Sequence, residues 1–163
     1  MEFTRELDVT PEEFFDQIER SIIDDVQRAT GKRVSRNKLA GLKYQKRSSQ
    51  VRKSNVTMNV KIRKYRYPEV YEVHFAYDSG SNTIRYQVEP RGEDGLTLTY
   101  REKFVNPAPE RGLFANFRLR RYEKRAERRA DQTLKAIVRQ AKKDRQNHHG
   151  QNPLLEQLES EED

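Results

Sequence analysis

Six stretches of the chain alternate apolar and polar side chains with the period of two that is typical of β-strands. The first lies at residues 3–9, and five more follow between residues 42 and 104. The positions on the apolar face are Phe3, Arg5, Leu7 and Val9; Leu42, Tyr44, Lys46 and Ser48; Val56, Met58, Val60 and Ile62; Tyr71, Val73, Phe75 and Tyr77; Ile84, Tyr86 and Val88; and Leu96, Leu98, Tyr100, Glu102 and Phe104. Turn signals at residues 78–81 and 90–95 keep the later connections short. We therefore predict an antiparallel meander with one face covered and the other in water.

Helical periods flank the strands. Thr10 and Glu13 form a capping box, which starts a helix that should end at Gly31. Its apolar stripe consists of Phe14, Phe15, Ile18, Ile22, Ile23 and Val26. A short helix is predicted at residues 35–39, and the prolines at 107 and 109 end the last strand. A long helix should then run from about Leu113 to about Arg145, with the stripe Leu119, Tyr122, Ala126, Ala130, Leu134, Ile137 and Ala141.

A single curved sheet must cover its apolar face, and the long C-terminal helix is the obvious cover. We predict an α+β helix-grip fold, in which an antiparallel sheet of about six strands wraps around that helix. This domain should span residues 1–145. The remaining residues 146–163 are polar and then acidic, and we predict that they form a disordered tail.

Composition narrows the class of protein. The chain of 163 residues has no Cys, which excludes disulfides, thiolate catalysis and zinc sites with Cys ligands. No apolar run reaches the ~18 residues of a membrane span, and the N-terminus is too charged for a signal peptide. Phosphate-loop, dinucleotide, G-x-S-x-G and H-E-x-x-H motifs are absent. We predict a cytoplasmic protein with no catalytic residue, metal or cofactor that the sequence can single out, although its many carboxylates leave enzymatic activity undecided.

Several local motifs resemble known families. The opening F-x-R-x-L-x-V-x-P-E-x-F-F, from Phe3 to Phe15, resembles the first strand and helix of helix-grip proteins, the lipid-transfer, pollen-allergen and polyketide-cyclase (START-like) superfamily. The Ala-Thr-Gly-Lys step at residues 29–32, L-x-G-x-x-Y-x-K at residues 39–46 and Y-x-E-x-F at residues 100–104 resemble an uncharacterised bacterial family, domain-of-unknown-function family 3284. The family implies no activity. The superfamily resemblance implies a cavity between sheet and long helix that holds an apolar or amphipathic small molecule.

Three charged residues fall on the predicted apolar face. Arg5, Lys46 and Glu102 are in register with apolar neighbours, so each needs a partner, water or a ligand. Because the first strand should pair with the last, we hypothesise that Arg5 faces Glu102 and that the pair forms the polar end of a pocket. Alternatives are a purely structural pair, a bulge that turns one residue outward, or an arginine that reaches solvent past the rim.

The leading functional prediction is therefore non-enzymatic binding of an apolar or amphipathic small molecule between sheet and helix. The same residues would also serve as plain core, so they are candidates for lining only. The candidates are Arg5, Tyr44, Met58, Val60, Tyr71, Val73, Phe75, Tyr86, Leu98, Tyr100, Glu102, Phe117 and Leu134.

Charge is segregated along the chain and raises an alternative. Residues 1–25 have a net charge of −7, residues 26–68 have +14 with no acid, and residues 106–145 have +8. The basic segments either balance the acidic first helix or form a surface for nucleic acid or another polyanion. The polyanion candidates are Lys43, Arg47, Lys61, Arg63, Arg118, Arg121, Arg125 and Arg128. A protein partner for the arginine-rich helix is a third option, which includes the chain's own acidic tail. Within that helix, Arg120 with Glu123, Lys124 with Glu127, and Asp131 with Lys135 have the spacing of ion pairs.

Overall fold

The computed structural model describes residues 1–48, 56–106 and 111–160. Its elements are the strand β1 (Glu2–Leu7), the helix α1 (Pro11–Thr30), the 3-10 helix η1 (Arg36–Lys38), the strands β2 (Lys43–Ser48), β3 (Val56–Arg66), β4 (Val70–Tyr77), β5 (Gly80–Arg91) and β6 (Gly95–Val105), and the helix α2 (Ala115–Ser160). The predicted strands and helices and their order are confirmed. The predicted proline break at residues 107–109 lies outside the described residues.

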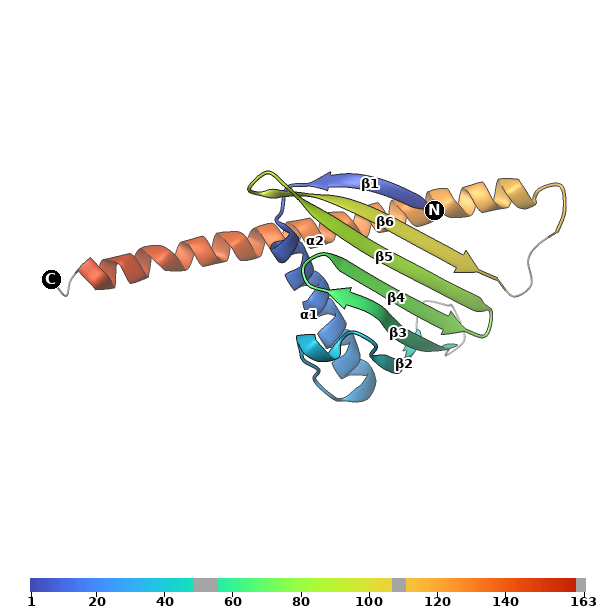
Figure 1. The fold of residues 1–163 in the computed structure, drawn as a ribbon, viewed down its shortest axis with the longest axis horizontal. Coiled ribbons are helices and arrows are strands. Elements are labelled where there is room, and N and C mark those ends of the chain that lie inside the picture. Colours follow the sequence, from blue (N-terminus) through green and yellow to red (C-terminus); the bar gives the residue numbers. More distant parts are fainter. Residues whose placement is uncertain (49–55, 107–110, 161–163) are drawn as a thin grey trace.

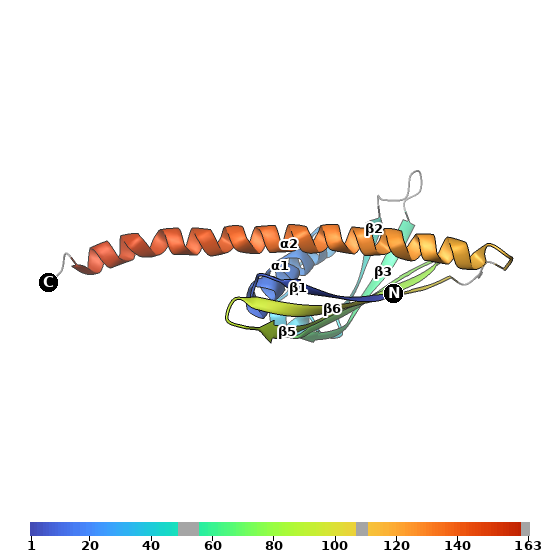
Figure 2. The same ribbon diagram turned by 90° about the horizontal axis from the view of Figure 1, so that it is seen from above.

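The strands form one antiparallel sheet in the order β1-β6-β5-β4-β3-β2, so the first and last strands are neighbours (Figure 1). Both helices lie on the same side of this curved sheet (Figure 1), and the view from above shows α2 as a second layer along it (Figure 2). This arrangement confirms the helix-grip fold. No helix in the described ranges is long and apolar enough to cross a membrane.

The first helix starts and ends as its sequence predicts. The Thr10 hydroxyl accepts a hydrogen bond from the Glu13 amide at 3.1 Å, and the Glu13 carboxylate accepts one from the Thr10 amide at 3.3 Å. Gly31 ends the helix with a φ of 72°, a left-handed conformation that costs glycine little. The apolar stripe of α1 is buried against the sheet and includes Phe14, Phe15, Ile18, Ile22 and Val26.

The long helix turns mostly small side chains toward the sheet. Its buried residues are Ala126, Ala130, Leu134 and Ala141. Three of these four are alanines, which fill little of the space between the helix and the concave face of the sheet. Large side chains from the strands therefore occupy the interior.

The predicted end of α2 near Arg145 is wrong, because the helix continues to Ser160. We predicted disorder from the polarity of residues 146–163, but a polar segment extends an existing helix at little cost once the helix is nucleated. Residues 156–160 lie at the far end of α2 from the arginine-rich residues 118–129 (Figure 1), roughly 50 Å away at about 1.5 Å per residue. Folding back of this part of the tail onto the arginine-rich segment is therefore excluded. Residues 161–163 lie outside the described residues, and the domain boundary at residue 145 stays a prediction.

Candidate ligand-binding site

Five aromatic side chains form a row across the inner face of the sheet. The strand register places Tyr65 opposite Tyr71, Tyr71 opposite Tyr86, Tyr86 opposite Tyr100, and Tyr100 opposite Phe3. Successive ring centroids along the row are 6.3, 6.1, 5.4 and 4.8 Å apart, which are contact distances for aromatic pairs. The alternating pattern predicts that such residues face inward, and the register adds that they touch.

This aromatic row divides the interior into a filled end and an open end. On one side of the row, Phe14 of α1 packs edge-on against Tyr86 at 6.0 Å, and Leu98 is fully buried beneath the helix. On the other side, Ile84 is only partly buried and Phe104 is 39 % exposed. Val60 and Val73 are buried on this side as well, so the open region is confined to the part of β5 and β6 beside Ile84 and Phe104.

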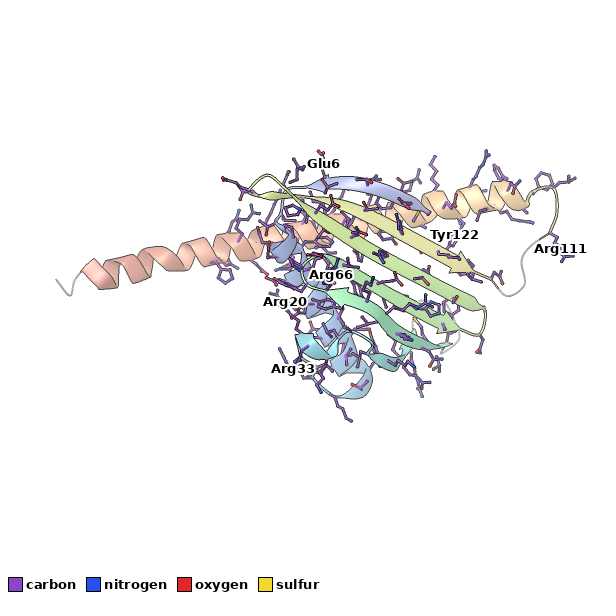
Figure 3. The ribbon with its side chains drawn as sticks, in the orientation of Figure 1. Glu6, Arg20, Arg33, Arg66, Arg111 and Tyr122 are labelled. Carbon is purple, nitrogen blue, oxygen red and sulfur yellow. The ribbon has the colours of Figure 1, made fainter. Side chains whose placement is uncertain are left out.

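A cavity of about 570 Å³ lies at the open end and extends from the first turns of α2 around β6 to the outer face of the sheet. Its inner walls are Met1, Glu102, Phe104, Leu119, Tyr122, Glu123 and Ala126. Its outer rim consists of Glu2, Glu72, Thr83, Arg85, Arg101 and Lys103. Tyr122 lies where α2 passes the end of β6 (Figure 3) and packs on Phe104 at 5.3 Å. Two further depressions, of about 460 Å³ beside η1 and 390 Å³ on the outer face of β2–β4, lie outside this interior.

Glu102 is the polar centre of this cavity. Its carboxylate accepts a hydrogen bond from the Tyr100 hydroxyl at 2.9 Å and another from Asn82 Nδ2 at 2.8 Å. The Met1 ammonium donates to the backbone oxygen of Glu102 at 2.9 Å. Burial raises the pKa of the Tyr100 hydroxyl, and Tyr86 and the Glu102 charge raise it further. Burial and the Glu102 charge likewise raise the pKa of Tyr86 to about 12, so both phenols are neutral donors at physiological pH.

The predicted Arg5–Glu102 pair is wrong. The register places Arg5 opposite Leu98, whereas Glu102 lies beyond the start of β1, beside Met1. Arg5 does face inward, but it reaches α2, where it donates to Asp131 at 3.0 and 3.1 Å and to Glu127 at 2.8 Å. Two carboxylates one helical turn apart thus hold one guanidinium and tie β1 to α2.

Lys46 and Tyr44 share a different partner at the other edge of the sheet. Lys46 Nζ lies 2.9 Å from Asp25 Oδ2 of α1, and the Tyr44 hydroxyl donates to the same oxygen at 2.6 Å. Burial raises the pKa of Tyr44, and the hydrogen bond to Asp25 raises it further. Tyr44 therefore belongs to a contact between α1 and β2 and is not part of the cavity at Glu102.

The other predicted lining residues have several locations. The sheet brings Met58, Val60, Tyr71, Val73, Phe75, Tyr86, Leu98 and Tyr100 to its inner face, and Val60, Val73, Leu98 and Leu134 are buried core. Phe117 is 60 % exposed, so the prediction that it lines the interior is wrong. It precedes the buried Ala126 by nine residues, about two and a half turns, which places it on the opposite side of α2.

Two residues of the candidate site were missed. Glu123 lies between Leu119 and Ala126 on the inward stripe of α2, and Asn82 precedes Ile84 by two residues on β5, so period and alternation could have identified both. Glu123 was instead expected to pair with Arg120. None of the three predicted helical ion pairs forms within the described ranges, and Glu127 and Asp131 bind Arg5 instead.

The polyanion candidates form two separate surfaces. Lys43, Lys61 and His74 are neighbours on the outer face of the sheet, on the strands that also contain Arg47 and Arg63. Burial lowers the pKa of His74, and Arg63 and Lys61 lower it further. The candidates Arg118, Arg121, Arg125 and Arg128 lie on α2, which covers the opposite, inner face (Figure 2). The structure therefore does not join the two sets into one basic patch.

Several solved structures share this fold at low sequence identity. Ara h 8.0201 has a TM-score of 0.58 at 11 % identity, and the match covers 86 % of this chain and 95 % of the other. A protein of unknown function from Staphylococcus aureus, SA2116, has a TM-score of 0.55 at 11 % identity, with 86 % and 92 % covered. A conserved protein from Geobacillus kaustophilus has a TM-score of 0.53 at 16 % identity, with 87 % and 94 % covered. At these identities the similarities show the fold alone.

The chain also matches one protein family, although a search of curated proteins finds no match. The match covers residues 1–113, which include α1 and all six strands and thus the strand wall of the cavity. It includes the motifs around Phe3–Phe15, Leu39–Lys46 and Tyr100–Phe104 that indicated this relationship. The chain therefore belongs to the family described as domain of unknown function DUF3284, whose sheet here has the helix-grip arrangement.

Proposed function

We propose that this protein binds an amphipathic small molecule in the cavity between β6 and α2, without chemical conversion of the ligand. The observation that carries the proposal is the cavity of about 570 Å³ with the Glu102 carboxylate in its wall. Small-molecule sites have volumes of roughly 300–1,000 Å³ and combine apolar surface with polar groups that fix the orientation of the ligand. Phe104, Leu119 and Ala126 offer the apolar surface, and Glu102 offers the polar anchor.

The test is to fill the cavity. Ala126 is buried and lines it, so Ala126→Trp should obstruct it, whereas Ala136→Trp changes an exposed position on the same helix. Native mass spectrometry of protein purified from cells after a high-salt wash should show a small-molecule adduct on the wild type and on Ala136→Trp. Ala126→Trp should lose it while keeping a cooperative melting transition. An adduct that persists in Ala126→Trp, or binding of no small molecule by folded wild-type protein, would contradict the proposal.

Binding to nucleic acid or another polyanion stays the alternative function. The cytoplasmic location also stays a prediction. No observation favours nucleic acid, because its two candidate surfaces face opposite ways. Retention on a heparin column that falls steeply with salt, and that Lys43→Gln with Lys61→Gln abolishes, would support the outer-sheet version of this alternative.

A further inference from the structure

We infer that the ligand of the cavity between β6 and α2 is an organic cation, an amine whose apolar part enters the cavity while its ammonium group contacts Glu102. This inference rests on the proposed function and adds the class of ligand. It starts from a difference between Glu102 and the other charged side chains that face the interior.

Those other charges are matched within the fold. Arg5 is held by Glu127 and Asp131, Lys46 by Asp25, and Arg145 by Glu13. Glu102 is also partly buried, but among the described residues its carboxylate contacts only the neutral donors Tyr100 and Asn82. Neutral donors satisfy hydrogen bonds without cancelling the charge, so a partly buried negative charge remains.

The surroundings of Glu102 favour a cation as the missing partner. Glu123, on the facing wall of α2, is partly buried and has no ion-pair partner in the described part of the chain. Asn82 Oδ1 is buried without a donor, so the cluster has more acceptors than donors. The rings of Tyr122 and Phe104 line the same space, and aromatic faces attract ammonium groups.

The cations near the cavity are already engaged or point elsewhere. On its outer rim, Arg101 lies 2.7 Å from Glu2, and Arg85 lies 3.1 Å from Glu72. Lys103 is exposed and faces Thr83 on the outer side of the sheet. The Met1 ammonium binds the backbone oxygen of Glu102 rather than its carboxylate. None of these groups forms an ion pair with Glu102 or Glu123 within the described residues.

Three probes with the same alkyl chain separate charge from apolar binding: n-octylamine, 1-octanol and octanoate, each titrated calorimetrically at neutral pH. Wild-type protein should bind octylamine about tenfold more tightly than octanol, and octanoate most weakly. Glu102→Gln keeps the size of the side chain and should remove this preference, so that octylamine binds the variant no more tightly than octanol does. The control Glu89→Gln, at an exposed position of β5, should behave as wild type.

The outcomes are distinguishable. If octylamine and octanol bind equally, or octanoate binds best, the inference about charge is wrong while the proposed function stands. If none of the three probes binds, both the inference and its premise fail. An octylamine preference that survives in Glu102→Gln would assign the cation to another site and overturn the inference.

A second, independent observation concerns the exposed apolar surface at the start of α2, at the same end of the molecule. All six exposed large apolar residues of the described chain lie in two short segments there. They are Phe104, Val105, Leu113, Phe114, Phe117 and Leu119, and Leu113 and Phe114 are 98 % and 70 % exposed. Phe104 and Leu119 border the cavity, whereas Phe117 lies on the opposite, outward side of α2. Such a concentrated apolar surface marks an interaction site.

Four cations lie on the same side of α2 as Phe117. Arg121, Lys124, Arg125 and Arg128 follow Phe117 at spacings of three and four residues, which places all of them on one side of α2. None has an ion-pair partner among the described residues, and Arg121 lies 5.9 Å from the Phe117 ring. The acids of this stretch, Glu123 and Glu127, face inward to the cavity and to Arg5.

The structure assigns Leu113, Phe114 and Phe117, together with the four cations that follow on the outward side of α2, to the surface of an anionic lipid bilayer. Apolar side chains followed by cations on one side of a helix fit the boundary between acyl chains and phosphate groups. Leu113, the most exposed of these residues, is aliphatic and cannot stack on nucleobases, which disfavours single-stranded nucleic acid. A symmetric pair of copies would bring the four cations of each chain together, which disfavours a dimer through this side.

Co-sedimentation with vesicles tests this assignment. Wild-type protein should bind vesicles containing phosphatidylglycerol and not vesicles of phosphatidylcholine alone. Phe114→Ser with Phe117→Ser, and separately Arg121→Gln with Arg125→Gln, should each weaken binding about tenfold. Lys43→Gln with Lys61→Gln, which removes two cations from the outer sheet face, should leave it unchanged. Absence of vesicle binding, or a variant series that instead abolishes DNA binding or dimerisation, would overturn the assignment.

Discussion

Single residues show how far the sequence predicts the site. Alternation alone predicts that Arg5, Lys46 and Glu102 face inward, and the structure places all three there. Their partners depend on which residues of other elements lie opposite, and no local pattern contains that information. The partners of Arg5 are therefore on α2 and that of Lys46 is on α1, although the sequence suggested that Arg5 would meet Glu102.

A double-mutant cycle measures these partnerships. Arg5→Met and Asp131→Asn should be coupled by about 1 kcal/mol in the free energy of unfolding, a modest value because both side chains are about one-third exposed. Arg5→Met and Glu102→Gln should be additive within about 0.5 kcal/mol, because those two side chains do not meet. Urea denaturation of the single and double variants provides the free energies. Coupling between Arg5 and Glu102 in place of Arg5 and Asp131 would contradict the observed register.

At the scale of elements, periodicity predicts which side of a strand or helix is buried, but not where an element meets its neighbours. The capping box and Gly31 bound α1 as expected, because those signals are local. The prediction that Phe117 lines the interior is wrong because this residue lies on the side of α2 opposite the buried Ala126 and is exposed. The resemblance implied a cavity between sheet and helix, but periodicity could not predict that it lies at the end of β6, since that position depends on how the elements pack.

The contact between the two helices should make stability depend on pH. Burial alone would raise the pKa of Glu13, but hydrogen bonds from Arg145 and Thr10 outweigh it and hold the pKa below its ordinary value. Because the folded state then binds the proton less readily than the unfolded state, this contact stabilises above the ordinary pKa of a glutamate, ~4.3, and the stabilisation is lost as the pH falls through the lower folded value.

Glu13→Gln should therefore lower the free energy of unfolding by about 1 kcal/mol at pH 7 and flatten its decline between roughly pH 5 and pH 3. Arg145→Gln should flatten the same slope, because it removes the donor at 2.8 Å. Urea denaturation across this pH range measures the slope for each protein. If both variants keep the wild-type slope of the free energy of unfolding against pH, the contact does not cause the loss of stability at acid pH.

At the scale of the whole molecule, two features lie at one end. The open end of the interior, with Glu102, is bordered by Phe104 and Leu119, which also belong to the exposed apolar surface at the start of α2. The first strand closes the sheet beside the last, so Met1 also reaches this end. This geometry would let a ligand with an apolar tail pass between a lipid surface and the cavity without crossing the filled core beneath α1.

The C-terminal part of α2, at the opposite end of the molecule, concerns the predicted domain boundary at residue 145. Among the described side chains of α2, those of Asp144 and Arg145 make the last hydrogen bonds to the body, Asp144 with Gln17 and Arg20, and Arg145 with Glu13 and Asp8. Beyond Arg145 the helix projects away from the sheet (Figure 2). Residues 146–160 should therefore add little to the stability of the fold, even though they are helical.

Two truncated chains test whether residues 146–160 contribute to the stability of the fold. A chain ending at residue 145 keeps those contacts and should melt within about 2 °C of the full chain. A chain ending at residue 140 loses Asp144, Arg145 and the buried Ala141, and should melt roughly 5 °C or more lower, at about 2–4 °C per kcal/mol. Circular dichroism melts at one protein concentration compare the three chains. If the chain ending at residue 145 melts as early as the shorter one, residues 146–160 support the fold, and the boundary lies further along the helix.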